Sequence, residues 1–489
     1  MRSRLAVLLA SVFSIVFATA AFGQVATALI SQGEPLAGDM LGTEIISINN
    51  PATNGVGGFA FTVNTGPDAT FNNIWGNPVA GPGTVLQAEQ TVGDLTITSF
   101  ESFFGMSDAG DVFYGTSTTS AASGETGLDG VFLNDFSILN EEEPIASLPG
   151  FFSTFNSRPG ITFTGMPYWV GGVSTTQGGG TQQRVLFKEL SATPVLMGGD
   201  TIVGIAEPLQ ANTGIDFDVR FSAAGTNYIL VSDLESSAAI NTVVVLNGEA
   251  ATVGGAVLRE GTVIPSSSGG NGVETWDNFD FLGIRENGGF MVTGDSDAAA
   301  LVDEFVLIDG EIVLREGDAV NGGTLNGSIE GAFLNEDGDW AVTWDYDVGA
   351  DNFEVLIVNG EVVLAEGDAV DLNGDGIISS ADNGAVLEDF NGISSLNISR
   401  RDAMGDIRAY FVADVDVGDD SVEVGFEMTV NVATIIKGDV NMDGVVNLLD
   451  VEPFIDAISG TFVAEADTNC DGVVNLLDVG PFIDLLNGG

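Results

Sequence analysis

The sequence predicts a mainly β fold, a propeller-like array of about seven four-stranded repeats, followed by a small α-helical C-terminal module. Three observations predict it. Short alternating apolar runs, separated by glycine-rich turns, extend from Gln24 to about Val430. A hairpin unit recurs within that region, and two nearly identical acidic loops stand close to the C-terminus. We therefore divide the chain into residues 1–23, a β-repeat domain over 24–432 and a C-terminal module over 437–489.

The first residues have the layout of a secretory signal peptide. Arg2 and Arg4 precede an apolar run from Leu5 to about Phe17, and small residues follow as far as Gly23, where we expect cleavage. The alternative is a membrane anchor, which needs about 18 consecutive apolar residues, and no run in the chain reaches that length. The sequence thus predicts a secreted protein, extracellular or at the cell surface, with no membrane span after cleavage.

The composition is that of a folded but strongly acidic protein. Hydrophobic residues make up 44% of the chain, and 70 acidic residues stand against 13 basic ones, a formal net charge of −57. Such a surface repels nucleic acid, because nucleic-acid binding relies on Lys and Arg, and it favours cations. The chain has no histidine, which excludes Ser-His-Asp and Cys-His catalysis and argues against a catalytic zinc site. The single cysteine, Cys470, excludes an internal disulfide.

The repeat is clearest in one hairpin. Asn359-Gly360 joins the apolar runs 353–358 and 361–365, and this dipeptide is the strongest short signal for a type I′ turn. Similar hairpins recur at 244–249 and 305–311, with a period of roughly 50 to 60 residues, which is the size of a propeller blade. The repeat region loosely resembles the tandem β-repeat regions of secreted proteins.

The two ends of the repeat region predict how the array closes. The mature chain begins with what looks like the last strand of a unit, and residues 421–430 end a unit that lacks one. Pairing these two ends would close a ring and remove both exposed sheet edges. An open β-sandwich or a solenoid built from the same hairpins is the alternative.

Two twelve-residue segments near the C-terminus, 439–450 and 467–478, match nearly position for position. Each has oxygen-bearing side chains at loop positions 1, 3, 5, 9 and 12 and glycine at position 6. Calcium takes six to eight oxygen ligands, and a chain that wraps around it offers alternate side chains, while the sharp turn at position 6 favours glycine. Two copies 28 residues apart argue against a chance turn.

A short helix is predicted after each loop. Pro453 and Pro481 belong in the first turn of these helices, because proline breaks a helix interior. The two apolar stripes should pack together, and calcium should supply much of the folding free energy of so small a module. The residues at helical spacing are Val451, Phe454, Ile455 and Ile458, then Val479, Phe482, Ile483 and Leu486.

This duplicated loop–helix segment, which lacks the entering helix of an ordinary EF-hand, resembles a type I dockerin domain. The resemblance implies two bound calcium ions and a cohesin domain as the partner, commonly in assemblies that degrade polysaccharides. The implied ligands are Asp439, Asn441, Asp443, Val445, Asn447 and Asp450 in the first loop, and Asp467, Asn469, Asp471, Val473, Asn475 and Asp478 in the second.

The positions just before the last acid of each loop depart from the dockerin pattern. Hydroxyl residues often stand there, whereas this chain has Leu448-Leu449 and Leu476-Leu477. These leucines indicate either an apolar contact with the partner or the internal core of the module. Because both halves carry the same residues, a partner could be engaged in either of two orientations.

Residues 371–382 repeat the ligand spacing a third time. No amphipathic helix follows this loop, and it has no paired copy. We predict a lone calcium site that staples a surface loop. Its ligands would be Asp371, Asn373, Asp375, Ile377, Ser379 and Asp382.

Two functions fit these features. In the first, the protein is non-catalytic, and the calcium module docks a β-repeat binding platform onto a cohesin-like partner or an extracellular assembly. The alternative is a polysaccharide hydrolase or lyase delivered by the same module; glycoside hydrolysis needs two carboxylates beside the sugar, and 70 acids allow no choice among them. We favour the platform, with polysaccharide left open as its ligand. The aromatic residues that a sugar site could use are expected in the core: Trp75, Tyr168, Trp169, Trp276, Trp340 and Trp344.

Overall fold

The computed structural model describes residues 24–38, 43–66, 72–77, 83–155, 159–212, 215, 218–236, 241–391, 395–418, 420–432, 440, 446–459, 466, 468, 474–476 and 478–486. The predicted signal peptide and Cys470 lie outside these residues. Two compact units make up the chain, the first from Met1–Arg400 and Arg408–Val430, the second from Arg401–Ile407 and Asn431–Gly489.

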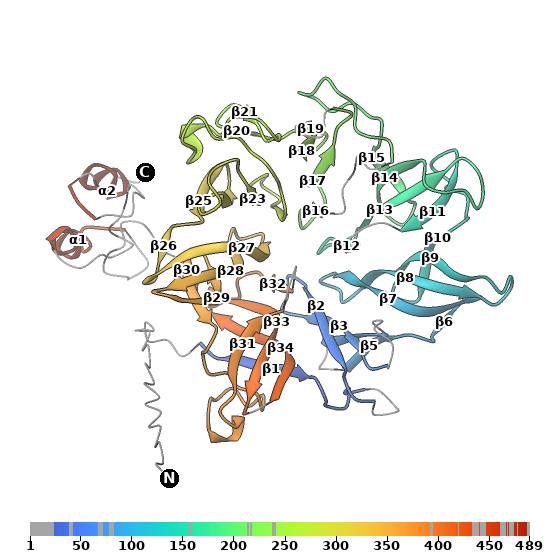
Figure 1. Ribbon diagram of the computed structural model, residues 1–489, viewed down its shortest axis with the longest axis horizontal. Coiled ribbons are helices and arrows are strands. Elements are labelled where there is room, and N and C mark those ends of the chain that lie inside the picture. Colours follow the sequence, from blue (N-terminus) through green and yellow to red (C-terminus); the bar gives the residue numbers. More distant parts are fainter. Residues whose placement is uncertain are drawn as a thin grey trace, which may run out of the picture. The chain divides into compact units, whose positions relative to one another are not determined.

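The first unit is a seven-bladed β-propeller of four- and five-stranded antiparallel sheets (Figure 1). Blade one contains β2 (Ser47–Thr53), β3 (Phe59–Asn64), β4 (Asn73–Asn77) and β5 (Gly83–Gln87). Blade two contains β6 (Thr91–Val92), β7 (Leu95–Met106), β8 (Val112–Ser120), β9 (Thr126–Leu133) and β10 (Phe136–Asn140). Blade three contains β11 (Phe151–Phe155), β12 (Gly160–Ile161), β13 (Pro167–Ser174), β14 (Gln183–Lys188) and β15 (Thr193–Met197). Blade four contains β16 (Val219–Phe221), β17 (Tyr228–Asp233), β18 (Thr242–Leu246) and β19 (Glu249–Ala250).

The strands of the remaining blades are likewise given in chain order, apart from the N-terminal strand, which is given last. Blade five contains β22 (Leu282–Ile284), β23 (Phe290–Asp295), β24 (Glu304–Ile308) and β25 (Glu311–Arg315). Blade six contains β26 (Ala319–Val320), β27 (Gly323–Leu334), β28 (Trp340–Val348), β29 (Asp351–Val358) and β30 (Glu361–Ala365). Blade seven contains β31 (Val386–Phe390), β32 (Leu396–Ile398), β33 (Ile407–Val417), β34 (Asp420–Val430) and β1 (Ala26–Ser31). Outside the blades lie β20 (Thr252–Val253), β21 (Ala256–Val257) and the 3₁₀ turns η1 (Ser266–Ser268) and η2 (Ser380–Asp382).

The predicted ring closure is confirmed. The inner strands of neighbouring blades contact one another all the way round, from β2 through β7, β12, β16, β22, β27 and β32 back to β2. Strand β1, from the start of the chain, pairs antiparallel with β34 from the end of the propeller and so completes blade seven. This arrangement excludes the open sandwich and the solenoid. It removes the exposed sheet edges that an unclosed array would leave at both ends.

The predicted hairpin turns have the backbone that their sequences require. Asn359 and Gly360 have φ values of 50° and 88°, and Asp309-Gly310 repeats the pattern with 52° and 94°. Positive φ at both central residues defines the type I′ turn, which matches the twist of the flanking strands. Asparagine, aspartate and glycine adopt positive φ most readily, so the turn residues determine where in the sequence the hairpins form.

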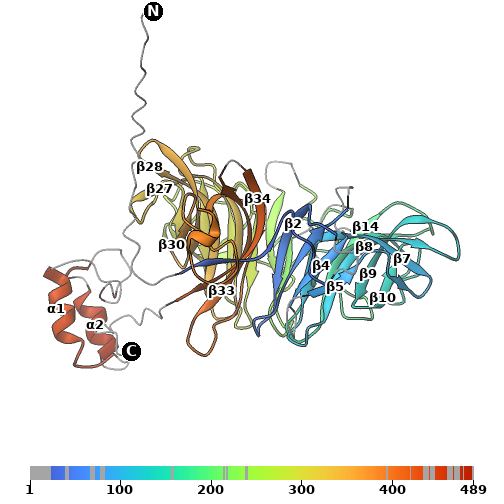
Figure 2. The ribbon, with the colours of Figure 1, turned by 90° about the horizontal axis from the view of Figure 1, so that it is seen from below.

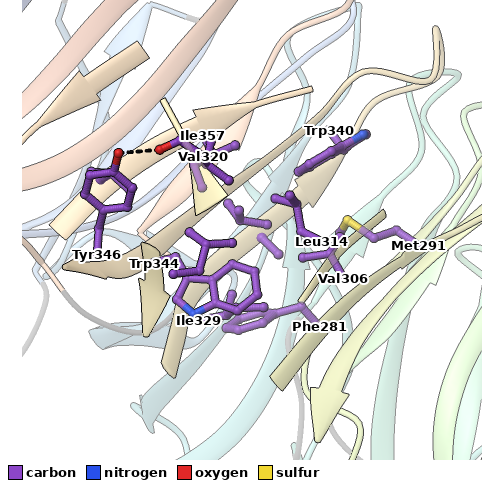
Figure 3. Close-up of a cluster of buried hydrophobic side chains, with 14 of the residues drawn as sticks. Phe281, Met291, Val306, Leu314, Val320, Ile329, Trp340, Trp344, Tyr346 and Ile357 are labelled. Carbon is purple, nitrogen blue, oxygen red and sulfur yellow. Dashed lines mark hydrogen bonds between the residues drawn. The ribbon is translucent and has the colours of Figure 1, made fainter. Parts of the chain in front are cut away.

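Hydrophobic side chains fill the space between neighbouring blades. Figure 3 shows one such cluster, in which Phe281 and Met291 of blade five lie against Trp340 and Trp344 of blade six. The Tyr346 hydroxyl donates a hydrogen bond to the Val320 carbonyl at one side of it. All six aromatic residues weighed as sugar platforms are buried, which confirms their core role: Trp75, Tyr168, Trp169, Trp276, Trp340 and Trp344.

The second unit contains the two predicted helices, α1 (Val451–Ser459) and α2 (Val479–Leu486), which lie side by side (Figure 2). Phe454 and Phe482 stack between them with ring centroids 3.9 Å apart and planes within 5°. The predicted apolar stripe was too wide, because Ile455 and Ile483 are exposed rather than packed. The two phenylalanine rings face each other between the helices. Because successive side chains lie about 100° apart around a helix, the next residue of each helix points away from that contact.

Candidate calcium sites

The twelfth positions of the two C-terminal loops have the same geometry. Asp450 and Asp478 are fully buried, and each precedes the first residue of a helix. One carboxylate oxygen of Asp450 accepts a hydrogen bond from the Asn447 backbone N–H at 2.8 Å, and Asp478 accepts one from Asn475 at the same distance. The helix dipole stabilises the charged form of a carboxylate at the helix N-terminus. A buried carboxylate of this kind can bind a cation that compensates its charge. The other predicted ligands of these loops lie outside the described residues: Asp439, Asn441, Asp443, Val445, Asp467, Asn469, Asp471 and Val473.

The third loop is fully described and wraps around two buried carboxylates. Asp371 accepts backbone hydrogen bonds from Gly374, Asp375 and Gly376 at 2.9, 3.3 and 2.5 Å. At the other end of the loop, Asp382 accepts them from Leu372, Asn373 and Ser379 at 3.1, 3.2 and 2.6 Å. Both side chains are almost inaccessible to solvent. The loop therefore folds around these two buried carboxylates, while residues 373–381 between them are exposed.

The end of the third loop repeats the geometry of the two C-terminal loops. In all three, the carboxylate at position 12 accepts a hydrogen bond from the backbone N–H at position 9, between 2.6 and 2.8 Å. The backbone N–H of the same acid returns to the carbonyl of position 9 at 3.1 to 3.3 Å. In the third loop, however, the last three residues form the 3₁₀ turn η2, capped by Ser379 and Asp382, and the next element is strand β31 rather than an α-helix.

The donors of the third loop fit calcium in kind. The set would comprise the carboxylates of Asp371, Asp375 and Asp382, the Asn373 amide oxygen, the Ser379 hydroxyl and the Ile377 carbonyl, all hard oxygens. The backbone N–H of Ser379 and the other loop hydrogen bonds hold the pKa of the Asp382 carboxyl below its usual range, so it is charged at neutral pH. Among the described residues no three acidic side chains gather into one metal-binding group. Binding would therefore require the exposed Asp375 to turn inward.

The leucines before the last loop acid are exposed. Leu448, Leu449 and Leu476 have exposed fractions of 81%, 68% and 77%, whereas Leu477 lies outside the described residues. Their side chains are therefore not part of the small core, which consists of Val440, Phe454, Ala457, Ala466 and Phe482 among the described residues. Leu448 and Leu476, and likewise Ile455 and Ile483, stand at matched positions of the two halves and are exposed. Exposed apolar side chains that gather into a patch mark an interaction surface.

A cavity of about 120 Å³ lies among the inner strands of the propeller and is lined by residues from all seven blades. Its described lining holds one carboxylate, Glu336, whose oxygens accept backbone hydrogen bonds from Ala223 at 2.5 Å and Glu286 at 2.8 Å. The guanidinium of Arg220 also lines it, 3.6 Å from the carboxylate of Asp218. The described lining thus lacks the pair of free carboxyl groups that glycoside hydrolysis needs.

Sequence reasoning missed a recurring acid that joins neighbouring blades. A glutamate in the strand two places outward from the inner strand of a blade accepts a backbone hydrogen bond from the inner side of the next blade. The bonds run to Glu304 from Ile329 at 3.1 Å, to Glu354 from Phe390 at 2.9 Å, and to Glu423 from Ile48. An acid within the third long apolar run of these three repeats was the signal that could have revealed them.

These interblade acids hold protons more tightly than free glutamate does. Burial raises the pKa of Glu304 to about 9, and the nearby Asp295 adds to the effect. Burial also raises the pKa of Glu354 to about 8, together with a shared hydrogen bond to Asp389. Perturbed carboxyl pairs can mark active sites, but these lie between blades and are not among the residues lining the cavity. Their contacts are those of structural links.

Comparison with known proteins supports the C-terminal assignment. The dockerin type I domain family matches residues 437–487. No match was found among curated proteins. Within the described residues, no helix is long and apolar enough to span a lipid bilayer.

Weak structural similarities extend over the propeller. The chain is similar to prolyl oligopeptidase B from Galerina marginata, with 10% identity over 76% of this chain and 48% of that one and a TM-score of 0.37. It thus spans about half the length of that enzyme. It is also similar to the parainfluenza virus 5 hemagglutinin-neuraminidase ectodomain (9% identity, 83% and 86% covered, TM-score 0.31). A third similar structure is Penicillium chrysogenum α-L-arabinanase complexed with arabinobiose (10% identity, 83% of this chain and 97% of that one covered, TM-score 0.29). Because all three TM-scores lie below 0.5, we infer neither an activity nor a ligand from them.

Dockerin type I domains bind calcium and typically occur in extracellular or cell-surface proteins. The duplicated loops, the buried acids at both helix starts and the family match all fall on the same segment. The chain therefore carries a dockerin type I domain at residues 437–487, C-terminal in sequence to a seven-bladed β-propeller.

Proposed function

We propose that this protein is a secreted, calcium-dependent docking protein whose dockerin domain attaches the propeller to a cohesin domain of an extracellular assembly. The observation that carries the proposal is the dockerin match at residues 437–487, together with the exposed leucines at the matched positions of its two halves. The propeller would serve as the displayed binding platform. The alternative, a polysaccharide-degrading enzyme, gains no support from the described lining of the axial cavity.

Calcium would be held at three places. In the dockerin domain the ligands would be the six residues of each loop named from the sequence, of which Asp450 and Asp478 close the two sites from the helix starts. The third ion would bind the 371–382 loop, which is supported by the hydrogen-bond geometry that its last acid shares with Asp450 and Asp478. Each ion neutralises buried carboxylates and so links folding to calcium concentration.

The proposed contact with cohesin is apolar. Leu448, Leu449 and Leu476 would enter the interface from the exposed side of the dockerin domain, and Leu477, which lies outside the described residues, is the fourth residue of the set. Burial of large exposed apolar side chains is the main source of affinity in such interfaces. The equivalence of the two halves would allow two binding orientations.

The test is binding of the full chain to a panel of immobilised cohesin domains in calcium and in excess chelator. We expect at least one cohesin to bind in calcium and to be released by chelator. Calcium titration of the same protein should give a stoichiometry of three. Failure of every cohesin to bind the calcium-loaded chain would contradict the docking proposal, whereas turnover of a polysaccharide by the propeller would favour the alternative.

A further inference from the structure

The strand that closes the propeller is anchored unevenly by its side chains. Of the six residues of β1, only Ala26, Ile30 and Ser31 are buried, and Thr27, Ala28 and Leu29 are partly exposed. Its pairing with β34 is interrupted by an irregularity between Ala28 and Ile30. Ile30 belongs to a hydrophobic core cluster and Leu29 packs against it, whereas Thr27 and Ala28 bury little apolar surface. The Thr27–Ala28 part of β1 therefore depends on its main-chain hydrogen bonds.

The outer edge of β1 is covered by the 371–382 loop. The Ala28 N–H donates to the Asp371 carbonyl at 2.8 Å, and the Asp371 N–H donates to the Ala26 carbonyl at 3.0 Å. These two bonds form a parallel bridge between Thr27 and Asp371. Gly374 also approaches the strand, since a Cβ built on it would lie 3.0 Å from the Ala28 carbonyl oxygen. The loop thus supplies the neighbour that an edge strand otherwise lacks.

Asp371 takes part both in the pairing with β1 and in the hydrogen bonds that shape the 371–382 loop. Its backbone pairs with β1, while its buried carboxylate gathers the N–H groups of Gly374, Asp375 and Gly376. It is also the first predicted ligand of the third calcium loop. The conformation of the loop and the position of the closing strand are therefore joined through a single residue.

We infer that calcium bound to the 371–382 loop fastens the closing strand β1, so that closure of the propeller ring is calcium-dependent. This inference rests on the proposed third calcium site. The ion compensates the mutual repulsion of Asp371, Asp375 and Asp382 and holds the loop in the shape that presents the Asp371 backbone to β1. Without the ion the loop loosens, the two hydrogen bonds are lost, and the main chain of Thr27 and Ala28 keeps only its interrupted pairing with β34.

The test is hydrogen exchange of β1 amides in the full chain, with and without calcium. Asp375→Asn is the decisive variant, because Asp375 is exposed and makes no described contact with β1. The asparagine keeps the oxygen that accepts the Ile377 N–H but removes the charge. We expect exchange in β1 to accelerate roughly 10- to 30-fold in this variant, as loss of two backbone hydrogen bonds predicts, with no change in β29. The matched control is Asp351→Asn, the same chemical change at an exposed residue outside the loop, which should leave β1 unchanged.

Calcium stoichiometry separates the two ways to fail. If the wild-type chain binds two ions rather than three, and Asp375→Asn also binds two, the third site itself is wrong. If Asp375→Asn loses one ion but β1 exchanges at the wild-type rate, the site stands and the link to ring closure is refuted. Loss of one ion together with faster exchange confined to β1 and its neighbour β34 supports the inference.

Discussion

Replacing Phe454 with alanine should make the folding of the dockerin domain demand far more calcium. Phe454 is almost fully buried and stacks on Phe482 at 3.9 Å, in a core with only three other buried residues among those described. Removing a buried phenylalanine costs about 3–5 kcal/mol, which is as much as the whole core of a domain of this size supplies. We therefore expect the Phe454→Ala domain to be unfolded in chelator and to fold only when calcium is abundant.

The size of the shift follows from linkage. If two calcium ions bind only the folded domain, a loss of about 3–5 kcal/mol is offset when calcium rises by roughly 10- to 70-fold, because each ion contributes RT times the logarithm of its concentration. The assay is hydrogen exchange of α1 amides in the full chain across a calcium titration. Ile455→Ala is the control on the same helix, since Ile455 is exposed, and its midpoint should stay within about twofold of the wild type. Equal midpoints for Phe454→Ala and Ile455→Ala would refute the reasoning.

Three further predictions test the interface and the propeller. Leu448→Asp or Leu476→Asp alone should weaken cohesin binding little, because the other half of the domain can still bind. The double variant should lose roughly 30-fold or more in affinity, measured by calorimetry. A single variant that abolishes binding would contradict the two binding orientations. Arg315→Met should destabilise the propeller by about 3–5 kcal/mol in denaturant unfolding, because it leaves the buried Glu274 carboxylate, now paired at 3.0 and 3.1 Å, without its counter-charge. Folding raises the pKa of Glu354 from 4.5 to about 8, so the folded protein holds this proton more tightly than the unfolded chain, and the contribution of this residue to stability falls as the pH rises across that interval. The free energy of unfolding of Glu354→Gln should therefore fall less than that of the wild type between pH 5 and pH 8. An equal fall would show that groups other than Glu354 cause the pH dependence.

The interblade acids show how the propeller tolerates so much negative charge. Glu304 and Glu354 keep their protons because burial disfavours the charged form, and each accepts a backbone hydrogen bond from the following blade. Part of the formal charge of −57 is thereby neutralised inside the fold at neutral pH. The net charge counted from the sequence overstates the charge of the folded protein.

Local chemistry was readable in the sequence. The calcium loops are recognisable because all their ligands fall within twelve consecutive residues, and the hairpins because Asn359-Gly360 and its counterparts set the turn within two. The helix starts after the loops followed from capping and proline placement alone. Even ring closure was predictable from the sequence. The last repeat lacks one strand and the start of the mature chain supplies an extra one, and pairing the two removes both open sheet edges.

Tertiary structure decided what depends on residues far apart in the chain. The sequence left the paired leucines before the last loop acids divided between core and surface. Their exposure shows that Leu448, Leu449 and Leu476 lie outside the core, whose centre is the stacked pair Phe454 and Phe482. Glu423 bonds to Ile48, 375 residues away, and Asp371 bonds to β1 across most of the propeller sequence. Such contacts have no local signature, because the partner is set by how the blades close into a ring rather than by spacing along the chain.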